Sequence, residues 1–220
     1  MTVVVHVLSD THNEHGSLAI PKQGGDILIH CGDACIKGSY SEGLNFLQWF
    51  VKQPYKYKVL CPGNHDKKLK DHPDLQMLAR EYGVIILHQD DSVREIMGLK
   101  IWGGQFVPGF KRGTMEPRHD IDVQRKAWVN MPENLDILVT HVPPQYISDL
   151  TSNNESIGCE YLHMVIKEKN PSVHLFGHVH EKQGEILTIG STTFYNCANM
   201  DRNYLLNYTK PTEVIFNEKK

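Results

Sequence analysis

The feature that most constrains this chain is a set of metal-binding residue types at the ends of predicted β-strands. Four of the five segments that carry them follow directly on a short apolar, β-branched run, and the remaining one follows residues 59–62. Carboxylate, amide and imidazole groups all coordinate metal ions, and the ends of strands line the binding crevice of open α/β folds. The five segments are Asp10-Thr11-His12, Gly32-Asp33, Gly63-Asn64-His65-Asp66, Thr140-His141 and Gly177-His178-Val179-His180.

The hydrophobic pattern predicts an α/β fold with more than one sheet. Apolar runs predict strands at residues 3–9, 26–31, 57–61, 135–140 and 173–176. Helical spacing predicts helices at residues 43–52, 73–82, 121–130 and 157–169. Residues 84–87, 92–97 and 99–102 have the pattern of antiparallel hairpins, and short strands return from residue 185 onward. Because no linker or repeat interrupts this order, we expect one domain over residues 1–220.

Composition and charge argue against two classes of function. Apolar residues make up 40% of the 220 positions and the formal net charge is −3, so the chain lacks the basic face of a dedicated nucleic-acid-binding protein. No apolar run is long enough to span a bilayer. Met1 leads into a predicted strand without a signal peptide and the five cysteines are an odd number, so we expect reduced thiols in a cytoplasmic protein.

Cys31 and Cys35 flank Asp33 and leave two interpretations open. They could be thiolate ligands of zinc, or they could be small hydrophobic residues buried beside the site. The second interpretation is favoured.

The spacing of the ligand-type residues indicates two metal ions. In an extended segment, residues two apart point the same way, so Asp10 and His12 can reach one ion, and the same argument applies to His178 and His180. The Asp33 carboxylate can offer one oxygen to each of two ions. A neutral amide oxygen from Asn64 and an imidazole from His141 would complete the set of ligands around the second ion. Each signal is weak by itself, and the prediction rests on their joint occurrence.

These motifs, in this order, resemble the signature of the calcineurin-like metallophosphoesterases and run from residue 10 to residue 180. The resemblance implies a four-layer α-β-β-α sandwich, in which two mixed β-sheets pack together, helices lie outside, and the site lies at the C-terminal ends of the strands. His65 would be poised over the leaving group, and Asp66 would orient it. The implied ligands are Asp10, His12, Asp33 and His180 for one ion, and Asp33, Asn64, His141 and His178 for the other.

Finer resemblance favours the small single-domain members that cleave cyclic nucleotides and related phosphodiesters, and residues 25–33, 140–144, 176–181 and 195–198 carry it. The serine/threonine phosphatases of the superfamily have Asp-Arg-Gly after the second motif and Glu after Gly-Asn-His. Here those positions hold residues 36–38 (Ile-Lys-Gly) and Asp66. Some relatives have lost a histidine of the last motif and become weak enzymes or binding proteins, whereas this chain keeps both His178 and His180.

The expected activity is hydrolysis of a phosphodiester of a small substrate such as a cyclic nucleotide. Two divalent ions lower the pKa of a bridging water enough to supply hydroxide at neutral pH, and His65 would protonate the departing alkoxide. Mixed nitrogen and oxygen ligands favour manganese, with Fe, Zn, Co and Mg as alternatives. A phosphomonoesterase, a nuclease and a non-catalytic binding scaffold are the alternative functions, and the oligomeric state is left open.

The other histidines are expected to be structural. Those expected to be buried in strands or a helix are His6, His30, His163 and His174. Those expected in surface loops are His15, His72 and His88. Residues 105–118 are rich in Gly, Pro and aromatic residues and predict a long functional loop, either a structural lid or a surface that contacts a base or phosphate.

Overall fold

Two mixed β-sheets form the centre of the molecule in the computed structural model, which describes residues 2–88, 92–108 and 121–217. In the first sheet, β1 to β4 are parallel and β11 runs antiparallel to β1. Within the described residues, the strand order of this sheet is β11 (Thr212–Asn217), β1 (Thr2–Leu8), β2 (Gly25–His30), β3 (Tyr55–Leu60) and β4 (Val84–Ile86).

The second sheet has a parallel centre and two antiparallel edges. Strands β6, β7, β8 and β10 are parallel, and β5 and β9 pair antiparallel at either edge. The strand order, for the part of the chain that the structure describes, is β5 (Arg94–Ile96), β6 (Leu99–Gly104), β7 (Ile137–Thr140), β8 (Val173–Phe176), β10 (Thr192–Asn196) and β9 (Ile186–Ile189).

The core lies between the two sheets because every second residue of their strands is apolar. Val3, Val5 and Val7 on β1 share one buried cluster with Ile137 and Val139 on β7. Successive side chains of a strand point to opposite faces, so this spacing directs one face of each sheet inward. Each fully buried aliphatic side chain contributes about 1.5–3 kcal/mol relative to its exposed state.

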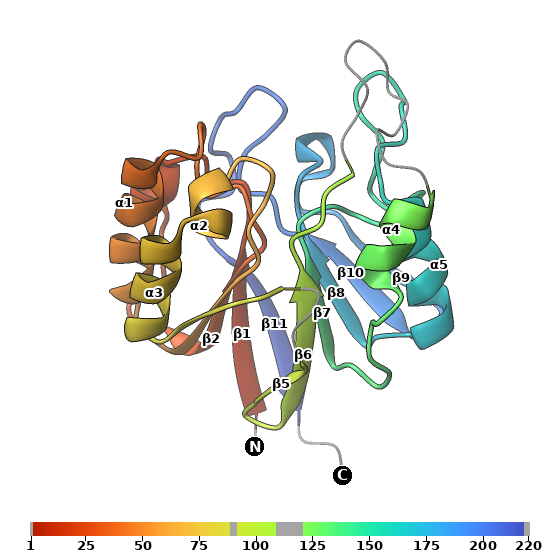
Figure 1. The fold of residues 1–220 in the computed structure, drawn as a ribbon, viewed down its shortest axis with the longest axis horizontal. Coiled ribbons are helices and arrows are strands. Elements are labelled where there is room, and N and C mark those ends of the chain that lie inside the picture. The colour runs from red at the N-terminus through yellow and green to blue at the C-terminus, as the bar shows by residue number, and fades with distance from the viewer. Residues whose placement is uncertain (1, 89–91, 109–120, 218–220) are drawn as a thin grey trace.

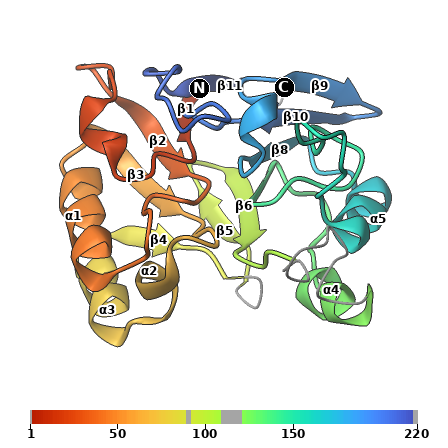
Figure 2. The ribbon, with the colours of Figure 1, turned by 90° about the horizontal axis from the view of Figure 1, so that it is seen from above.

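Helices cover the outer face of each sheet, which gives the α-β-β-α layers seen from above in Figure 2. A capping box starts α1, in which Ser39 and Glu42 satisfy each other's backbone N–H groups. The helices of the first side are α1 (Tyr40–Val51), α2 (Lys67–Asp71) and α3 (Pro73–Glu81), and those of the second side are α4 (Ile121–Trp128) and α5 (Glu160–Lys169). The four-layer fold that the resemblance implied is therefore confirmed.

Several local predictions differ from the structure. Residues 84–87 were expected in a hairpin, but β4 extends the first sheet parallel to β3, and the hairpin consists of β5 and β6 alone. Helix α2, of five residues, was not predicted because it is too short to show helical periodicity. Of the long loop predicted at residues 105–118, residues 109–118 lie outside the described residues.

The buried histidines match the predictions with two exceptions. His6, His30 and His174 are buried as expected, whereas His163 is only half-buried. The prediction for His15 was wrong, because this ring is 3% exposed and hydrogen-bonds to Asn45 on α1. A polar loop sequence around His15 hides this contact, since the partner comes from a helix 30 residues later.

The five cysteines are free and buried, which agrees with the favoured interpretation of Cys31 and Cys35. Neither belongs to the clusters of metal-binding groups found among the described residues. Burial raises the pKa of both thiols, so neither favours the thiolate form. Among the described helices, none has the length and apolar character needed to cross a bilayer.

Candidate metal centre

The predicted ligands gather at one edge of the molecule because each follows a parallel strand. Parallel strands end at the same edge of a sheet, which is the top edge in Figure 1. A backbone bridge between Ser9 and Ala198, just past β1 and β10, joins the corresponding edges of the two sheets. The residues concerned are Asp10 after β1, Asp33 after β2, Asn64 after β3, His141 after β7 and His178 after β8.

The first cluster consists of Asp10, His12 and His180, whose ligand atoms all lie within 4.8 Å of one another. Nδ1 of His12 donates to the carbonyl oxygen of Cys35, and Nδ1 of His180 donates to that of Asp201, both at 2.9 Å. Because a carbonyl oxygen only accepts, each ring turns its Nε2 toward the cluster. The two Nε2 atoms lie 3.4 Å apart, and that of His180 lies 3.2 Å from Oδ1 of Asp10. Two ring nitrogens and a carboxylate thus converge on one position.

The second cluster consists of Asp33, His141 and His178, again with all ligand atoms within 4.8 Å. Nδ1 of His141 donates to the carbonyl oxygen of Cys31 at 2.8 Å, so its Nε2 faces the cluster. This Nε2 lies 3.2 Å from Oδ2 of Asp33, 3.2 Å from Nδ1 of His178 and 3.1 Å from Oδ1 of Asn64. Four ligand-type atoms around one point fit a cation, because a single proton cannot satisfy them all.

One backbone hydrogen bond links the two clusters, and another holds the carboxylate of Asp33. The N–H of His178 donates to Oδ2 of Asp10 at 3.0 Å, and the N–H of His65 donates to Oδ1 of Asp33 at 2.8 Å. Both carboxylates are almost fully buried, because Asp10 is 0% exposed and Asp33 is 3% exposed. Buried carboxylates with only partial hydrogen bonding are costly unless positive charge lies near them.

Protonation of the rings shows how strongly the site favours positive charge. Burial opposes charge on His141, but the carboxylates of Asp33 and Asp10 nevertheless raise its pKa to about 9. Burial likewise opposes protonation of His180, and its hydrogen bond to Asp10 outweighs this and raises the pKa. By contrast, burial lowers the pKa of His178 to about 4, so this ring is neutral and free to coordinate.

Four of the seven predicted ligands adopt a left-handed backbone that residues other than glycine rarely adopt. The φ angles are 53° for Asp10, 37° for His12, 56° for Asp33 and 70° for His178. Such conformations cost on the order of 1–3 kcal/mol each and concentrate at functional sites. This feature was not visible in the sequence.

The same geometry corrects one prediction from spacing. His178 and His180 were expected to reach a common ion as neighbours in an extended segment, but His178 is left-handed and His180 begins a short 3₁₀ helix (His180–Lys182). The structure therefore places His178 in the second cluster and His180 in the first, which is the division that the resemblance implied.

Glycines before the ligands leave space that a side chain would fill. A methyl group on Gly63 would collide with the carboxylate of Asp33, and one on Gly177 would collide with that of Asp10. The strand ends can approach the carboxylates closely only because these two positions lack a Cβ.

His65 lies at the edge of the clusters with one ring nitrogen fixed. Its Nδ1 donates to the carbonyl oxygen of Ile36 at 2.5 Å, and its ring packs edge-on against His12 with centroids 5.0 Å apart. Because Nδ1 holds its proton in that bond, Nε2 is the atom through which His65 can give or take a proton.

Asp66 acts on the loops rather than on the ring of His65. Its buried carboxylate accepts hydrogen bonds from the backbone N–H groups of Ala34 at 3.3 Å, Cys35 at 2.9 Å and Gly63 at 3.0 Å. These bonds tie the loop of Asp33 to the loop that carries His65. Asp66 therefore positions His65 indirectly, through the backbone on either side of it.

Two buried histidines support the ligands in the same way in both sheets. Nε2 of His30 on β2 lies 3.0 Å from Oγ1 of Thr11, which is the residue between Asp10 and His12 in the chain. Nδ1 of His30 accepts a hydrogen bond from the N–H of Gly32. His174 on β8 lies 2.8 Å from Oγ1 of Thr140, next to His141. Sequence reasoning found these rings to be structural but not which loops they hold.

A cavity of about 190 Å³ opens onto both clusters, and it includes residues that the sequence analysis missed. The ring of Tyr204 packs against those of His12 and His180, with centroids 5.0 and 4.9 Å away. In the sequence, the only indication that the segment around Tyr204 belongs to the site was its position just after residues 195–198, which carry part of the family resemblance. The cavity is lined by Asp33, Asn64, His65, His178, His180, Glu181, Arg202 and Tyr204.

Metal binding to this site should be strongly linked to pH. Without metal, His141 keeps its proton up to its pKa of about 9, and coordination must displace that proton. The apparent affinity for Mn²⁺ should therefore rise by about tenfold per pH unit at neutral pH and level off as pH approaches the pKa. Calorimetric titration in two buffers of different ionisation enthalpy measures the protons released.

His163 is a half-buried residue on α5 outside the site, so the control variant His163→Ala should retain the same pH dependence. An affinity that does not change with pH, or binding without proton release, would contradict the proposed role of His141.

Comparison with known proteins places this geometry in a family. The family model described as calcineurin-like phosphoesterase matches residues 3–182. The UPF0046 protein K07C11.7 of Caenorhabditis elegans is 32% identical over 95% of this chain and 73% of its own length. The human metallophosphoesterase domain-containing protein 1 is 31% identical over 90% of this chain, which spans 66% of that protein.

Among solved structures, the phosphopantetheinyl hydrolase PptH of Mycobacterium tuberculosis has the same fold. The TM-score is 0.65 at 15% identity, over 96% of this chain and 95% of that one. With the family model and the curated relatives in agreement, the chain belongs to the calcineurin-like phosphoesterase family.

Proposed function

We propose that this chain hydrolyses phosphodiester bonds of small nucleotides, including cyclic ones, with the help of two divalent cations. The observation that carries the proposal is the convergence of buried carboxylates and inward-facing ring nitrogens in two adjacent clusters. Family membership supports a hydrolase. We further propose that residues 1–220 act as one domain, and that the free, buried cysteines fit a reducing compartment such as the cytoplasm.

The residues present fit a pair of cations. Nitrogen and oxygen donors in this mixture fit manganese, and Fe, Zn, Co and Mg are the alternatives. When bound, two such cations supply an activated water and offset the negative charge of the phosphate. We assign Asp10, His12, Asp33 and His180 to one cation, and Asp33, Asn64, His141 and His178 to the other.

The chain's own groups then orient the substrate and move a proton. His65 lines the cavity and can protonate the departing alkoxide through Nε2, while the carbonyl oxygen of Ile36 keeps the ring in one tautomer. The carboxylate of Asp66 fixes the two loops on which Asp33 and His65 stand. A sugar alkoxide is a poor leaving group, so this proton is needed most for diesters of nucleosides.

The dimensions of the site and the net charge of the chain favour a small diester over the alternatives. A cavity of about 190 Å³ and a net charge of −3 suit a small molecule better than duplex nucleic acid. A phosphomonoesterase is the second candidate, because the same clusters would bind a monoester. A non-catalytic scaffold is disfavoured, since the sequence keeps a residue able to coordinate metal at all seven positions that we assign as ligands.

The proposal is tested by comparing bis(p-nitrophenyl) phosphate with p-nitrophenyl phosphate on protein loaded with Mn²⁺. We expect kcat/KM for the diester to exceed that for the monoester by at least about tenfold. Chelation of the metal should abolish both activities. Efficient turnover of the monoester without cleavage of the diester would favour the second candidate and reject the first.

Removal of the proposed proton donor should reduce the rate without removing the metal. We expect His65→Ala to keep its metal content and to lower kcat about 10²–10⁴-fold for aryl diesters with basic leaving groups, and less for p-nitrophenyl esters. A series of substituted phenyl diesters measures this as a steeper dependence of log kcat on leaving-group pKa. The control His163→Ala should behave as wild type, and an unchanged slope in His65→Ala would refute the donor role.

A further inference from the structure

A second hollow adjoins the cavity over the clusters and is larger. This side groove measures about 490 Å³, against about 190 Å³ for the cavity. His180, Glu181 and Arg202 line both spaces, so the two are adjacent. The segment between β10 and β11 supplies much of its wall, including Arg202, Asn203 and Tyr208.

Arg202 is the cation among the residues that line this groove. Among the described residues, no acidic side chain forms an ion pair with it, and the side chain is exposed. The two acidic side chains that line the groove, Glu181 and Asp201, accept hydrogen bonds from backbone N–H groups. Asp201 accepts from the backbone of Asn203 and Leu205 at 2.8 and 3.0 Å, and Glu181 accepts from the N–H of Ser152 at 3.0 Å.

A second polar side chain, that of Gln183, lines the same groove. The amide nitrogen Nε2 of Gln183 is buried and makes no hydrogen bond in the part of the chain that the structure describes. A buried donor left unpaired costs about 1–3 kcal/mol, so a ligand acceptor in the groove favours turning this amide until Nε2 faces the groove and donates to the ligand. The cation of Arg202 and the amide of Gln183 together favour an anionic, oxygen-rich group.

The two ends of the site differ in a way that orients a diester. His65 lines the cavity but not the side groove, whereas Arg202 lines both. If His65 protonates the leaving group, the leaving group lies on the His65 side of the phosphate. The arm that stays on the phosphorus then extends toward the side groove.

We propose that the side groove binds a second anionic group on the retained arm of the substrate, through Arg202 and Gln183. The preferred substrates are thus phosphodiesters that carry a further phosphate or carboxylate, as in nucleotides with more than one phosphate. A guanidinium pairs with either anion through two parallel hydrogen bonds. This inference rests on the proposed phosphodiesterase function and adds its substrate preference.

The test uses three p-nitrophenyl diesters that share one leaving group and differ in the retained arm, which is ethyl, 2-carboxyethyl or 2-phosphoethyl. Wild-type protein with Mn²⁺ should show a kcat/KM about tenfold or more higher for at least one anionic arm than for ethyl, mainly through KM. The ratio between the two anionic arms tells a carboxylate from a phosphate preference.

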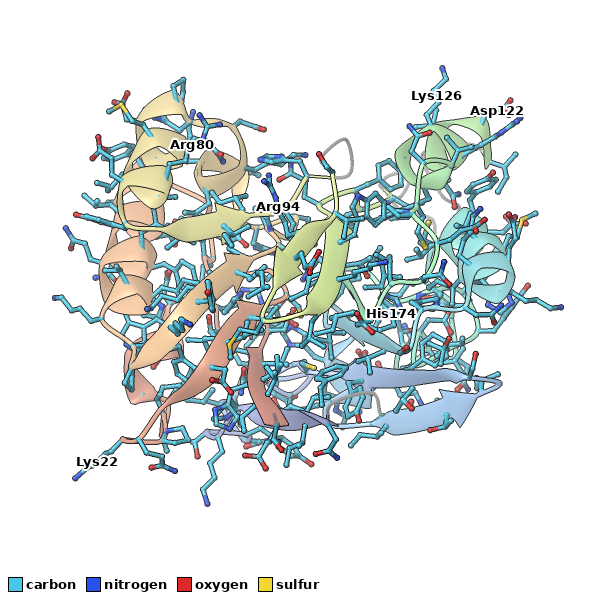
Figure 3. The ribbon with its side chains drawn as sticks, turned by 90° about the horizontal axis from the view of Figure 1, so that it is seen from below. Lys22, Arg80, Arg94, Asp122, Lys126 and His174 are labelled. Atoms are coloured by element: carbon cyan, nitrogen blue, oxygen red, sulfur yellow. The ribbon has the colours of Figure 1, made fainter. Side chains whose placement is uncertain are left out.

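In Arg202→Ala the preference over ethyl should fall to about one, in Arg202→Lys it should fall in part, and in Arg202→Glu it should invert. The control Lys126→Ala removes the same charge from α4, where Figure 3 shows the side chain pointing outward at a corner of the molecule. This control should keep the wild-type ratio.

Each outcome separates the two proposals. Turnover of all three esters with equal kcat/KM, or an equal loss for all three in Arg202→Ala, would overturn the side groove as an anion site and leave the phosphodiesterase function intact. Absence of turnover of any ester by metal-loaded wild-type protein would overturn the proposed function, and the substrate preference with it.

Discussion

The site depends on how three histidines are held by their outer nitrogens. In His12, His141 and His180, Nδ1 donates to a backbone carbonyl oxygen, and this one bond fixes both the tautomer and the direction of Nε2. The three Nε2 atoms therefore face the buried carboxylates, and each ring is held in one orientation. A site arranged in this way before any ligand arrives loses little entropy on binding. The carbonyl acceptors belong to neighbouring loops, so the ligand geometry follows from the fold as a whole.

The fold makes this arrangement possible by bringing the same ends of two sheets together. Parallel strands deliver loops from both sheets to one edge, and the bridge between Ser9 and Ala198 joins those edges. Burial of apolar side chains inside the sheets offsets the conformational cost of the strained loops. The left-handed residues of these loops follow strands that carry such buried side chains. The same interaction supports the ligand loops in both halves, because a histidine of the next strand lies within hydrogen-bond distance of Thr11 in one half and of Thr140 in the other.

Much of the fold and the gathering of the ligands could be predicted from the sequence, but their local geometry could not. Apolar runs located the central strands, and the motifs at their ends identified the residues that the structure brings together. The extended-chain argument for Asp10 and His12 reached the right cluster through the wrong conformation, because both residues are left-handed. Tyr204 and Arg202 were missed because nothing in a short polar segment shows that it folds back over His12 and the rest of the site. Contacts of this kind are set by tertiary structure, which periodicity does not record.

The central claim, that seven side chains hold two cations, is tested most directly by anomalous diffraction from crystals grown with Mn²⁺. We predict two manganese peaks about 3.5–4 Å apart, a separation typical of two-metal sites. One peak should lie among Asp10, His12 and His180, and the other among Asp33, His141 and His178. A single peak, or no peak within these clusters at saturating Mn²⁺, would contradict the account.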